Sequence, residues 1–92
     1  MPRVKVRFFG FGSKASGFDT RTEDIVDGTS LRQFWDELRS AADDGDLLAR
    51  IDERQVFFIR NGELVSHDRM KKTVVEDGDT VSIMVLAVGG ST

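Results

Sequence analysis

Only one segment of this chain carries the pattern of a long amphipathic helix. Four large apolar residues follow the i, i+3, i+4, i+7 spacing that aligns side chains on one side of a helix: Leu31, Phe34, Trp35 and Leu38. Ser30 precedes them as an N-cap, Gln33 completes the capping-box spacing, and Gly45 marks the expected end. A single helix can cover only one face of one sheet. The pattern therefore predicts a domain made of one helix and one sheet.

The residues before the helix predict two strands. Residues 4–9 alternate in character, so that Phe8 and Phe9 lie on opposite faces. The glycine-rich stretch 10–17 is expected to be a flexible connection. Residues 19–26 predict a second, more polar strand, which would form a hairpin with the first.

The residues after the helix predict two neighbouring strands and a tight turn. Residues 55–60 are apolar on both faces, which is typical of a strand inside a sheet. Asn61 and Gly62 favour a type I′ turn, because both central positions of that turn need positive φ. Residues 63–66 would form the short return strand.

A short helical turn and a last strand complete the predicted domain. Leu47, Leu48 and Ile51 predict a helical turn that closes one end of the core. An Asp-Gly-Asp turn at residues 77–79 precedes the last strand, which is expected over residues 80–88.

Length and composition agree with a single small domain. The chain has 92 residues, of which 39% are hydrophobic, enough for one modest core. It contains no cysteine, which excludes disulfides, thiolate metal sites and a cysteine nucleophile. No apolar run is long enough for a membrane span or a signal peptide, so a soluble, cytoplasmic protein is expected. The net charge of −3 argues against nucleic-acid binding.

No residue pattern predicts a catalytic or metal site. His67 is the only histidine, and we expect it to be a solvated surface residue rather than a ligand. Three aspartates near the expected helix end lack the spacing of a calcium loop and are also expected to be solvated: Asp43, Asp44 and Asp46. The stretch 10–17 has the glycines of a phosphate loop without its Gly-Lys-Ser/Thr ending, so we expect no nucleotide site there. A small basic cluster is expected to be solvated rather than to contact an acidic partner: Arg69, Lys71 and Lys72.

The C-terminal residues Gly89 and Gly90 are the first feature that points to a function. They directly follow the apolar strand that ends at Val88. Glycine has no Cβ, so paired glycines can enter a narrow channel and leave the Gly90 carbonyl carbon open to attack. A frayed terminus is the alternative interpretation. We therefore divide the chain into a domain at residues 1–88 and a tail at residues 89–92.

The face of the sheet turned away from the helix is the second feature. Alternation places Phe9 and Met84 on this face, Leu64 can join them, and Leu86 can extend the patch. A domain with one helix has no element of its own to cover this face, and exposed apolar clusters often mark a protein interface. Scattered exposed side chains are the alternative interpretation. An interface is favoured because the face and the tail share the last strand.

Over nearly its whole length, the chain resembles the MoaD/ThiS-type sulfur carrier proteins. The resemblance rests on four segments in order: Val-Lys-Val-Arg-Phe-Phe at 4–9, Arg-Asn-Gly-Glu-Leu-Val at 60–65, Glu-Asp-Gly-Asp-Thr-Val at 76–81, and Gly89-Gly90. It implies a ubiquitin-like β-grasp fold of the α+β class. In that fold one main helix packs on one face of a mixed sheet of four to five strands.

The resemblance also implies a carrier that is not itself an enzyme. An E1-like adenylating enzyme would activate the C-terminal glycine, Gly90, with ATP, and the acyl adenylate would become a thiocarboxylate. Gly89 would keep the tail slim, and Phe9, Leu64 and Met84 match positions of the family's docking face. A sulfur-accepting synthase would use the sulfur for molybdopterin, thiamin or a similar product. The carrier would hold no permanently bound cofactor and no metal.

Ser91 and Thr92 depart from the pattern of that family, because the free carboxylate then belongs to Thr92. Adenylation at Gly90 requires their removal, so a tail-processing protease is expected as a further partner. Two other functions stay open. The first is that of a ubiquitin-like modifier conjugated to lysines through Gly90. The second is that of a non-covalent interaction module with an inert tail.

Overall fold

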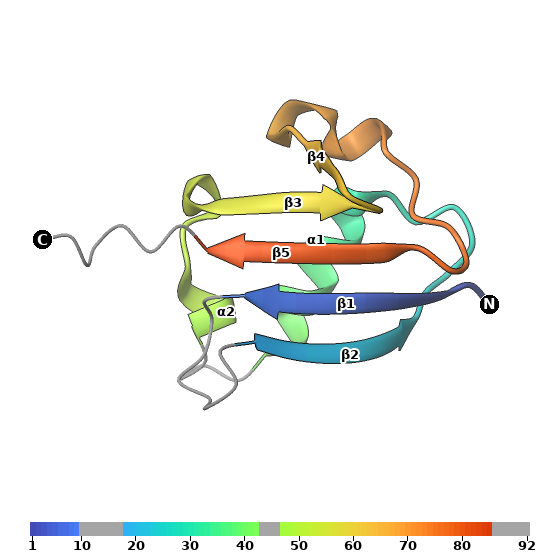
Figure 1. Ribbon diagram of the computed structural model, residues 1–92, viewed down its shortest axis with the longest axis horizontal. Coiled ribbons are helices and arrows are strands. Elements are labelled where there is room, and N and C mark those ends of the chain that lie inside the picture. Colours follow the sequence, from blue (N-terminus) through green and yellow to red (C-terminus); the bar gives the residue numbers. More distant parts are fainter. Residues whose placement is uncertain (10–17, 43–46, 86–92) are drawn as a thin grey trace, which may run out of the picture.

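The computed structural model describes residues 1–9, 18–42 and 47–85 (Figure 1). The elements follow in the order β1 (Arg3–Phe9), β2 (Phe18–Asp24), α1 (Leu31–Ala41), α2 (Leu47–Arg50), η1 (Glu53–Gln55), β3 (Val56–Arg60), β4 (Glu63–Val65), η2 (His67–Lys72) and β5 (Thr80–Val85). The two η elements are short 3-10 helices. The predicted sequence of strands, with the main helix after the second, is confirmed.

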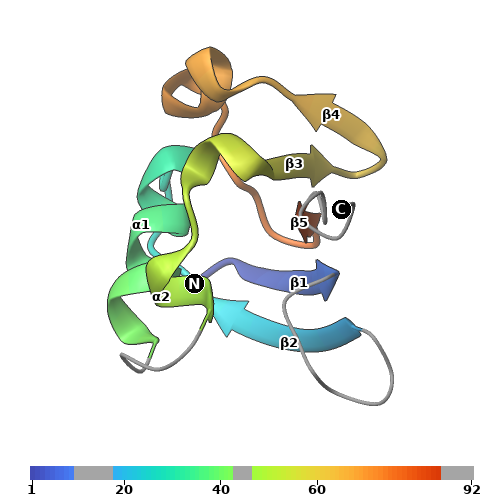
Figure 2. The same cartoon turned by 90° about the vertical axis from the view of Figure 1, so that its left-hand side faces the viewer.

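The five strands form one mixed sheet in the order β2-β1-β5-β3-β4. β1 and β5 run parallel, whereas the pairs β1–β2, β3–β5 and β3–β4 are antiparallel. Figure 2 shows α1 and α2 on the same side of this sheet. The predicted β-grasp architecture, with one main helix on one face of a mixed sheet, is therefore confirmed.

The main helix α1 begins as predicted and ends earlier than predicted. Ser30 Oγ accepts a hydrogen bond from the Gln33 N–H at 3.1 Å, and the Gln33 side-chain oxygen accepts one from the Ser30 N–H at 3.0 Å. The helix ends at Ala41, and Ala42 is already extended, whereas Gly45 was the predicted end. Positions 41 and 42 carry only alanine, so continuing the helix would bury little additional apolar surface. In the part of the chain that the structure describes, no helix is long and apolar enough to cross a membrane.

The core lies between α1 and the sheet. Its helix side consists of the four buried residues of the predicted stripe: Leu31, Phe34, Trp35 and Leu38. The Trp35 ring meets the Phe58 ring of β3 edge-on, with 5.0 Å between their centroids. The inward residues of β1 and β5 face them: Val4, Val6, Phe8, Val81 and Ile83 are buried, and Val85 is partly buried. Leu48 of α2 and the following Ile51 are buried at one end of the core, as predicted.

The other end of the core is closed by a segment to which the sequence pattern assigned no structure. Met70 of η2 is fully buried, and Val75 is 1% exposed. The Leu31 N–H at the start of α1 donates to the Thr73 carbonyl at 2.7 Å, and the Val75 N–H donates to the Thr29 carbonyl at 2.9 Å. These bonds attach the segment to the beginning of the main helix.

The second strand was predicted over residues 19–26 and the last over residues 80–88; the boundaries of the second differ from the prediction, and the last begins at Thr80 as predicted. β2 ends at Asp24 because the chain turns soon afterwards: the Thr29 N–H donates to the Val26 carbonyl at 3.1 Å, and Gly28 has a φ of +88°. β5 is described as far as Val85. Residues 86–88 of the predicted strand lie outside the described part of the chain.

Candidate functional site

The face of the sheet opposite α1, which we call the outward face, carries a row of large apolar side chains. Met84 of β5 lies beside Phe9 of β1 in the parallel register and opposite Phe57 of β3 in the antiparallel register. Met84 is 37% exposed and Phe57 is 41% exposed, while Phe9 is half-buried. We call these three residues the apolar row. Exposed apolar side chains that adjoin in this way are typical of a protein interface.

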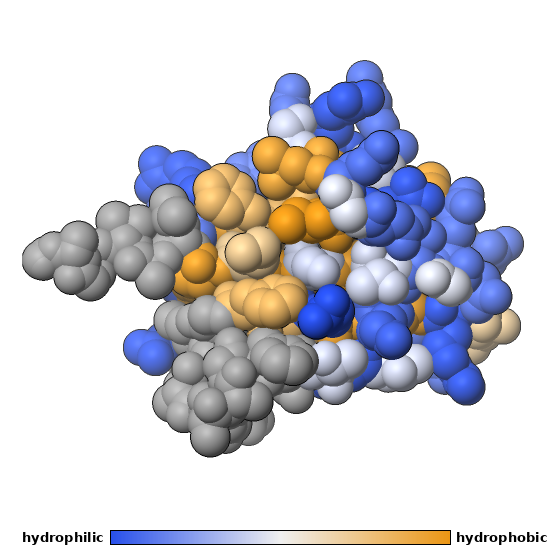
Figure 3. Space-filling view, in the orientation of Figure 1, coloured by the Kyte–Doolittle hydropathy of each residue, from blue (hydrophilic) through white to orange (hydrophobic). Residues whose placement is uncertain are grey.

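A second row of outward side chains runs alongside the apolar row. Leu64 of β4, which is 66% exposed, pairs with Ile59 of β3, and Ile59 pairs with Ser82 of β5. Arg7 of β1 lies beside Ser82, and its Cζ atom is 5.1 Å from the centroid of the Phe9 ring. Figure 3 shows this face as an apolar area over β3, β5 and β1, with hydrophilic residues along its border.

Three of the predicted docking residues lie on this one face. Phe9 and Met84 are direct neighbours, and Leu64 lies one row away on the edge strand. The fourth predicted docking residue, Leu86, lies outside the described residues, as does the diglycine at 89–90. Their function in docking and activation stays a prediction.

Phe57 and Ile59 also belong to the outward face, although the sequence pattern did not single them out. Val56 and Phe58 are fully buried, so alternation turns Phe57 and Ile59 outward. A signal for them was present in the sequence. The strand at residues 55–60 is apolar on both faces, whereas the single helix covers only one face of the sheet.

The turn after β3 has the backbone that its sequence predicts. Asn61 has a φ of +50° and Gly62 a φ of +87°, the positive values that a type I′ turn needs. The Asn61 side-chain oxygen accepts a hydrogen bond from the Thr80 N–H at 2.9 Å. The Asn61 N–H donates to the Thr80 carbonyl at 2.8 Å. The β3–β4 hairpin, which carries Leu64, is thereby attached to the first residue of β5.

Asp79 is a buried carboxylate that stabilises the same junction. It is 6% exposed, and its Oδ2 atom accepts hydrogen bonds at 2.8 Å from both Arg60 Nε and the Glu76 N–H. Its Oδ1 atom accepts one from Asn61 Nδ2 at 2.9 Å. Burial raises the pKa of Asp79, but these hydrogen bonds outweigh burial and hold the pKa below its ordinary value. The Asn61-Gly62 turn and the Asp-Gly-Asp turn at residues 77–79 thus belong to one polar network.

Asp79→Asn is expected to lower the free energy of unfolding by about 2–3 kcal/mol at neutral pH. The Asn side chain has only one acceptor oxygen, so it cannot satisfy all three donors, and Arg60 loses its charged partner. The loss is limited because the Arg60 side chain is 30% exposed. Urea denaturation followed by the fluorescence of Trp35, the only tryptophan, measures the change.

The effect of Asp79→Asn is also expected to depend on pH. Because the folded-state pKa of Asp79 is depressed, its stabilisation is present above the ordinary aspartate pKa, about 3.9, and is lost as pH falls through the folded-state value. The difference in stability between the wild-type chain and the variant therefore narrows below about pH 4. A difference that stays constant down to acid pH would contradict the proposed charge contribution.

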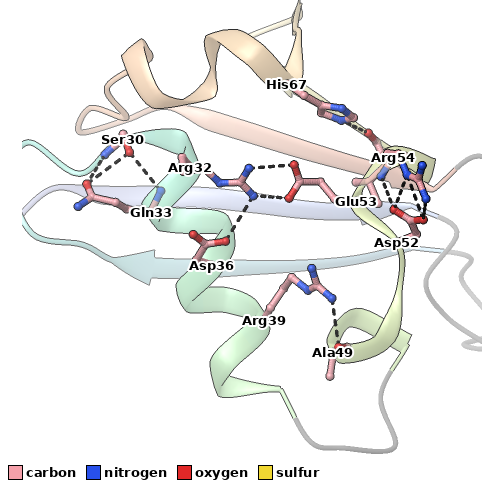
Figure 4. A network of polar contacts seen from close by, with 11 residues as sticks. Ser30, Arg32, Gln33, Asp36, Arg39, Ala49, Asp52, Glu53, Arg54 and His67 are labelled. Carbon is pink, nitrogen blue, oxygen red and sulfur yellow. Dashed lines mark hydrogen bonds and ion pairs between the residues drawn. The ribbon is translucent and has the colours of Figure 1, made fainter.

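A second polar network lies on the helix side of the sheet (Figure 4). Arg32 of α1 forms two hydrogen bonds with the Glu53 carboxylate of η1 and contacts Asp36 at 3.3 Å. The hydrogen bonds from Arg32 are the main cause that lowers the pKa of Glu53, and they outweigh the opposite effect of burial. This network joins α1 to the segment that leads into β3. The network lies away from the outward face, so we expect it to stabilise the fold rather than to contact a partner.

The prediction that His67 is a solvated surface residue is wrong. The side chain is half-buried, and its Nε2 atom lies 2.8 Å from the Val56 carbonyl oxygen (Figure 4). The imidazole ring packs edge-on against Phe58, with 5.6 Å between centroids. The position of His67 next to a turn did not indicate these contacts, because they form only when η2 folds back over the start of β3. His67 therefore links η2 to the sheet.

The other predicted polar features carry no assembled chemical site in the described residues. Within those residues, no group of three or more potential His, Cys, Asp or Glu ligands comes together as a metal site requires. Arg69, Lys71 and Lys72 are exposed on η2, as expected of a solvated cluster. The glycine-rich stretch 10–17 and the aspartates within 43–46 lie outside the described residues.

Comparisons with known proteins agree with this architecture. The family model of the ThiS family matches residues 6–90. Among solved structures, the chain is similar to the HVO 2177 protein of Haloferax volcanii, with a TM-score of 0.72 and 25% sequence identity over 97% of this chain and 87% of that one. No curated protein sequence matches the chain closely enough to count as a relative.

Proposed function

The chain belongs to the ThiS family of small carrier proteins, and on that basis we propose that it is a sulfur carrier whose reactive group is the carboxylate of Gly90. The family places it among sulfur-carrier and ubiquitin-like proteins that work with E1-like adenylating enzymes and sulfur-accepting partners. The proposal adds to this the identity of the reactive residue, the chemistry on it and the surface that the enzyme binds.

The proposed chemistry takes place on Gly90 and is catalysed by the partner. The Gly90 carboxylate attacks the α-phosphorus of ATP, pyrophosphate leaves, and an acyl adenylate forms. Sulfide or an equivalent sulfur donor then attacks the carbonyl carbon and displaces AMP, which leaves a thiocarboxylate. A synthase takes the sulfur from this group in the synthesis of molybdopterin, thiamin or a similar product. Gly90 has no Cβ, so its carbonyl carbon is accessible to attack.

The position of β5 is the observation that carries the proposal. Met84 of β5 is the centre of the apolar row, and the chain reaches Gly90 only five residues after Val85. Five extended residues span at most about 18 Å. When an enzyme binds the apolar row, the Gly90 carboxylate would therefore lie within about 18 Å of Val85, the residue that follows Met84.

The proposal includes removal of Ser91 and Thr92 by a tail-processing protease. In the 92-residue chain, Gly90 is joined to Ser91 by a peptide bond. Its carbonyl group is then an amide, which has no free carboxylate to attack ATP. Cleavage after Gly90 supplies that carboxylate.

Intact-mass spectrometry tests the proposed chemistry. The protein is isolated from its native cell and incubated with the E1-like adenylating enzyme of that cell, ATP and sulfide. We expect a species that ends at Gly90 and in which one oxygen has been replaced by sulfur. Its formation should require ATP, so a reaction without ATP is the control. A population that keeps Ser91 and Thr92 and acquires no sulfur would contradict the proposal.

The same material distinguishes the two alternative functions. Bands of higher mass that survive boiling and a thiol reductant would indicate conjugation to lysines through Gly90. Deletion of residues 90–92 would leave a non-covalent interaction module functional, whereas a carrier would lose its function.

A further inference from the structure

The strand β2 forms one edge of the sheet and is the longer of the two edge strands. It has seven residues, whereas β4 at the opposite edge has three. Figure 1 shows β2 at the lower border of the sheet, and among the described elements only β1 pairs with it. A strand with one unpaired side offers a row of backbone donors and acceptors to another chain.

Hydrogen bonds to β1 show which backbone groups of β2 are open. Directly after β2, the Ile25 N–H donates to the Pro2 carbonyl at 3.0 Å, so the backbone polar groups of Ile25 are turned toward β1. In an antiparallel pair this direction alternates from one residue to the next. The residues of β2 that face away from β1 therefore include Thr20, Thr22 and Asp24. We call their N–H and C=O groups the open edge.

A groove lies beside the open edge, on the helix side of the sheet. It has a volume of about 390 Å³ and lies between β2 and the C-terminal half of α1. The apolar part of its lining consists of Phe34, Leu38, Ala41 and Ala42. Phe34 and Leu38 are buried, whereas Ala41 is exposed and Ala42 is partly buried. The accessible apolar surface is thus made by two small side chains, across which a long side chain from a neighbouring strand can lie.

The border of the groove is acidic. Glu23 of β2 and Glu37 of α1 both line it, and neither carboxylate forms an ion pair with any residue in the described part of the chain. Arg21 also lines the groove, and its Cζ atom lies 4.8 Å from the centroid of the Phe8 ring. Even when the charge of Arg21 is counted in full, the two glutamates leave the border negative.

We propose that β2 binds an extended segment of a partner protein as an additional strand, with a lysine or arginine side chain of that segment in the groove. The open edge supplies the main-chain hydrogen bonds, and every second side chain of the added strand points to the helix side. There the methylene groups of the basic residue lie across Ala41 and Ala42. Its charged end lies between Glu23 and Glu37.

This site is separate from the surface used in the proposed function. The apolar row lies on the outward face, whereas the groove lies on the helix side of the sheet. The inference therefore does not depend on sulfur transfer. It adds a second, non-covalent contact to a different kind of partner.

A second copy of this chain fits the open edge less well than a basic segment does. Arg21 and Glu23 pair with the buried residues Val6 and Val4, so both belong to the helix side of β2. If two β2 strands paired, each copy would bring one base and one acid from these positions to the groove of the other. That pair adds no net positive charge to an acidic border, whereas a basic segment does.

A nuclear magnetic resonance titration of the full chain with a designed peptide tests the proposal. The probe is Thr-Lys-Thr-Lys-Val-Lys-Thr, which alternates lysine with β-branched residues. At a peptide concentration about ten times the Kd, hydrogen exchange at the Thr20, Thr22 and Asp24 amides should slow about tenfold. The Glu23 amide, which faces β1, should change less. Absence of binding, or slower exchange without this alternation, would contradict strand addition.

Two altered peptides separate the two parts of the proposal. Glutamate in place of every lysine should weaken binding at least about tenfold at low salt, and the difference should shrink at high salt. Proline in place of valine removes an N–H group that faces β2 and should also weaken binding at least about tenfold. Equal affinity of the glutamate peptide would refute the basic side chain in the groove, and equal affinity of the proline peptide would refute the added strand.

Thr22→Pro tests the open edge on the protein itself. The Thr22 N–H points away from the sheet, and proline is tolerated at such positions of an edge strand. We expect the affinity for the lysine peptide to fall at least about tenfold. Trp35 fluorescence checks that the variant is folded. A folded variant that binds the peptide like the wild-type chain would overturn the proposal.

Glu37→Lys provides a second test that does not alter the strand. Glu37 is exposed on α1, so the substitution should leave the fold intact. It should weaken binding of the lysine peptide at least about fivefold and strengthen binding of the glutamate peptide. The matched control is Glu63→Lys, which makes the same charge change on the opposite edge strand and should alter either affinity less than about twofold. Equal effects of the two variants would contradict a site in the groove.

Sedimentation of the free chain tests the second copy as the occupant. A dimer that Thr22→Pro converts to a monomer would assign the open edge to another copy of the chain and overturn the proposal. A chain that stays monomeric and binds the lysine peptide supports it. Either result leaves the proposed function in place, because sulfur acquisition at Gly90 is measured separately.

Discussion

A chain that ends at Gly90 is expected to be adenylated at least about 100-fold faster than the chain that ends at Thr92, when no protease is present. Two additional residues move the terminal carboxylate by about 7 Å. An error of about 1 Å in the position of a reacting group can already cost about 100-fold in rate. ATP–pyrophosphate exchange with the E1-like adenylating enzyme measures the difference directly, because it reports formation of the acyl adenylate.

Two further chains make this experiment specific for Gly90. A chain that ends at Ser91 has a free carboxylate but carries it one residue too far, so it should be nearly as inactive as the chain that ends at Thr92. A chain that ends at Gly89 is one residue too short to bring its carboxylate to the same position, so it should also be nearly inactive. Equal exchange rates for all four chains would show that the enzyme does not select the Gly90 carboxylate, and would refute its proposed function.

Met84→Asp is expected to weaken binding of the adenylating enzyme by at least about 2 kcal/mol, or roughly 30-fold in Kd. Met84 lies between Phe9 and Phe57 in the apolar row, so a carboxylate at this position would be desolvated in the interface without a partner. Because the side chain is 37% exposed in the free protein, the folded domain loses much less stability than the complex. Isothermal titration calorimetry with the adenylating enzyme measures the change in affinity.

Val26→Asp is the matched control for Met84→Asp. Val26 is another exposed apolar residue, 64% exposed, and it lies in the turn after β2 rather than on the outward face. The same substitution there should leave the Kd unchanged within about twofold. Trp35 is buried against Phe58, so its fluorescence confirms that both variants are folded. A Met84→Asp variant that binds as tightly as Val26→Asp would exclude the apolar row as the docking surface.

The main elements of the fold could be predicted because their signals are local. The helix stripe from Leu31 to Leu38 and the Ser30 cap depend on residues within two turns of one another, and the structure has both. The positive φ values of Asn61 and Gly62 depend on those two residues and their turn. By contrast, the helix end at Ala41 was missed because it depends on how much surface the next turn can bury against the rest of the domain.

The candidate site could be predicted only in part. Alternation identified Phe9 and Met84, since each strand shows by itself which side chains share a face. Alternation did not identify Phe57, because its strand is apolar on both faces. Only the sheet order shows that Phe57 adjoins Met84. His67 was misjudged because its partner, the Val56 carbonyl, comes from a strand eleven residues earlier in the chain.

The sequence by itself determined the strands, the main helix, the one-helix architecture, the family resemblance and the diglycine that the proposed chemistry uses. Only the tertiary structure decided that Asp79 is a buried acceptor for Arg60 and Asn61, and that apolar and basic side chains adjoin on the outward face. The physical reason is the distance along the chain. Periodicity and turn chemistry act among near neighbours, whereas β1, β3 and β5 become neighbours only when the sheet assembles.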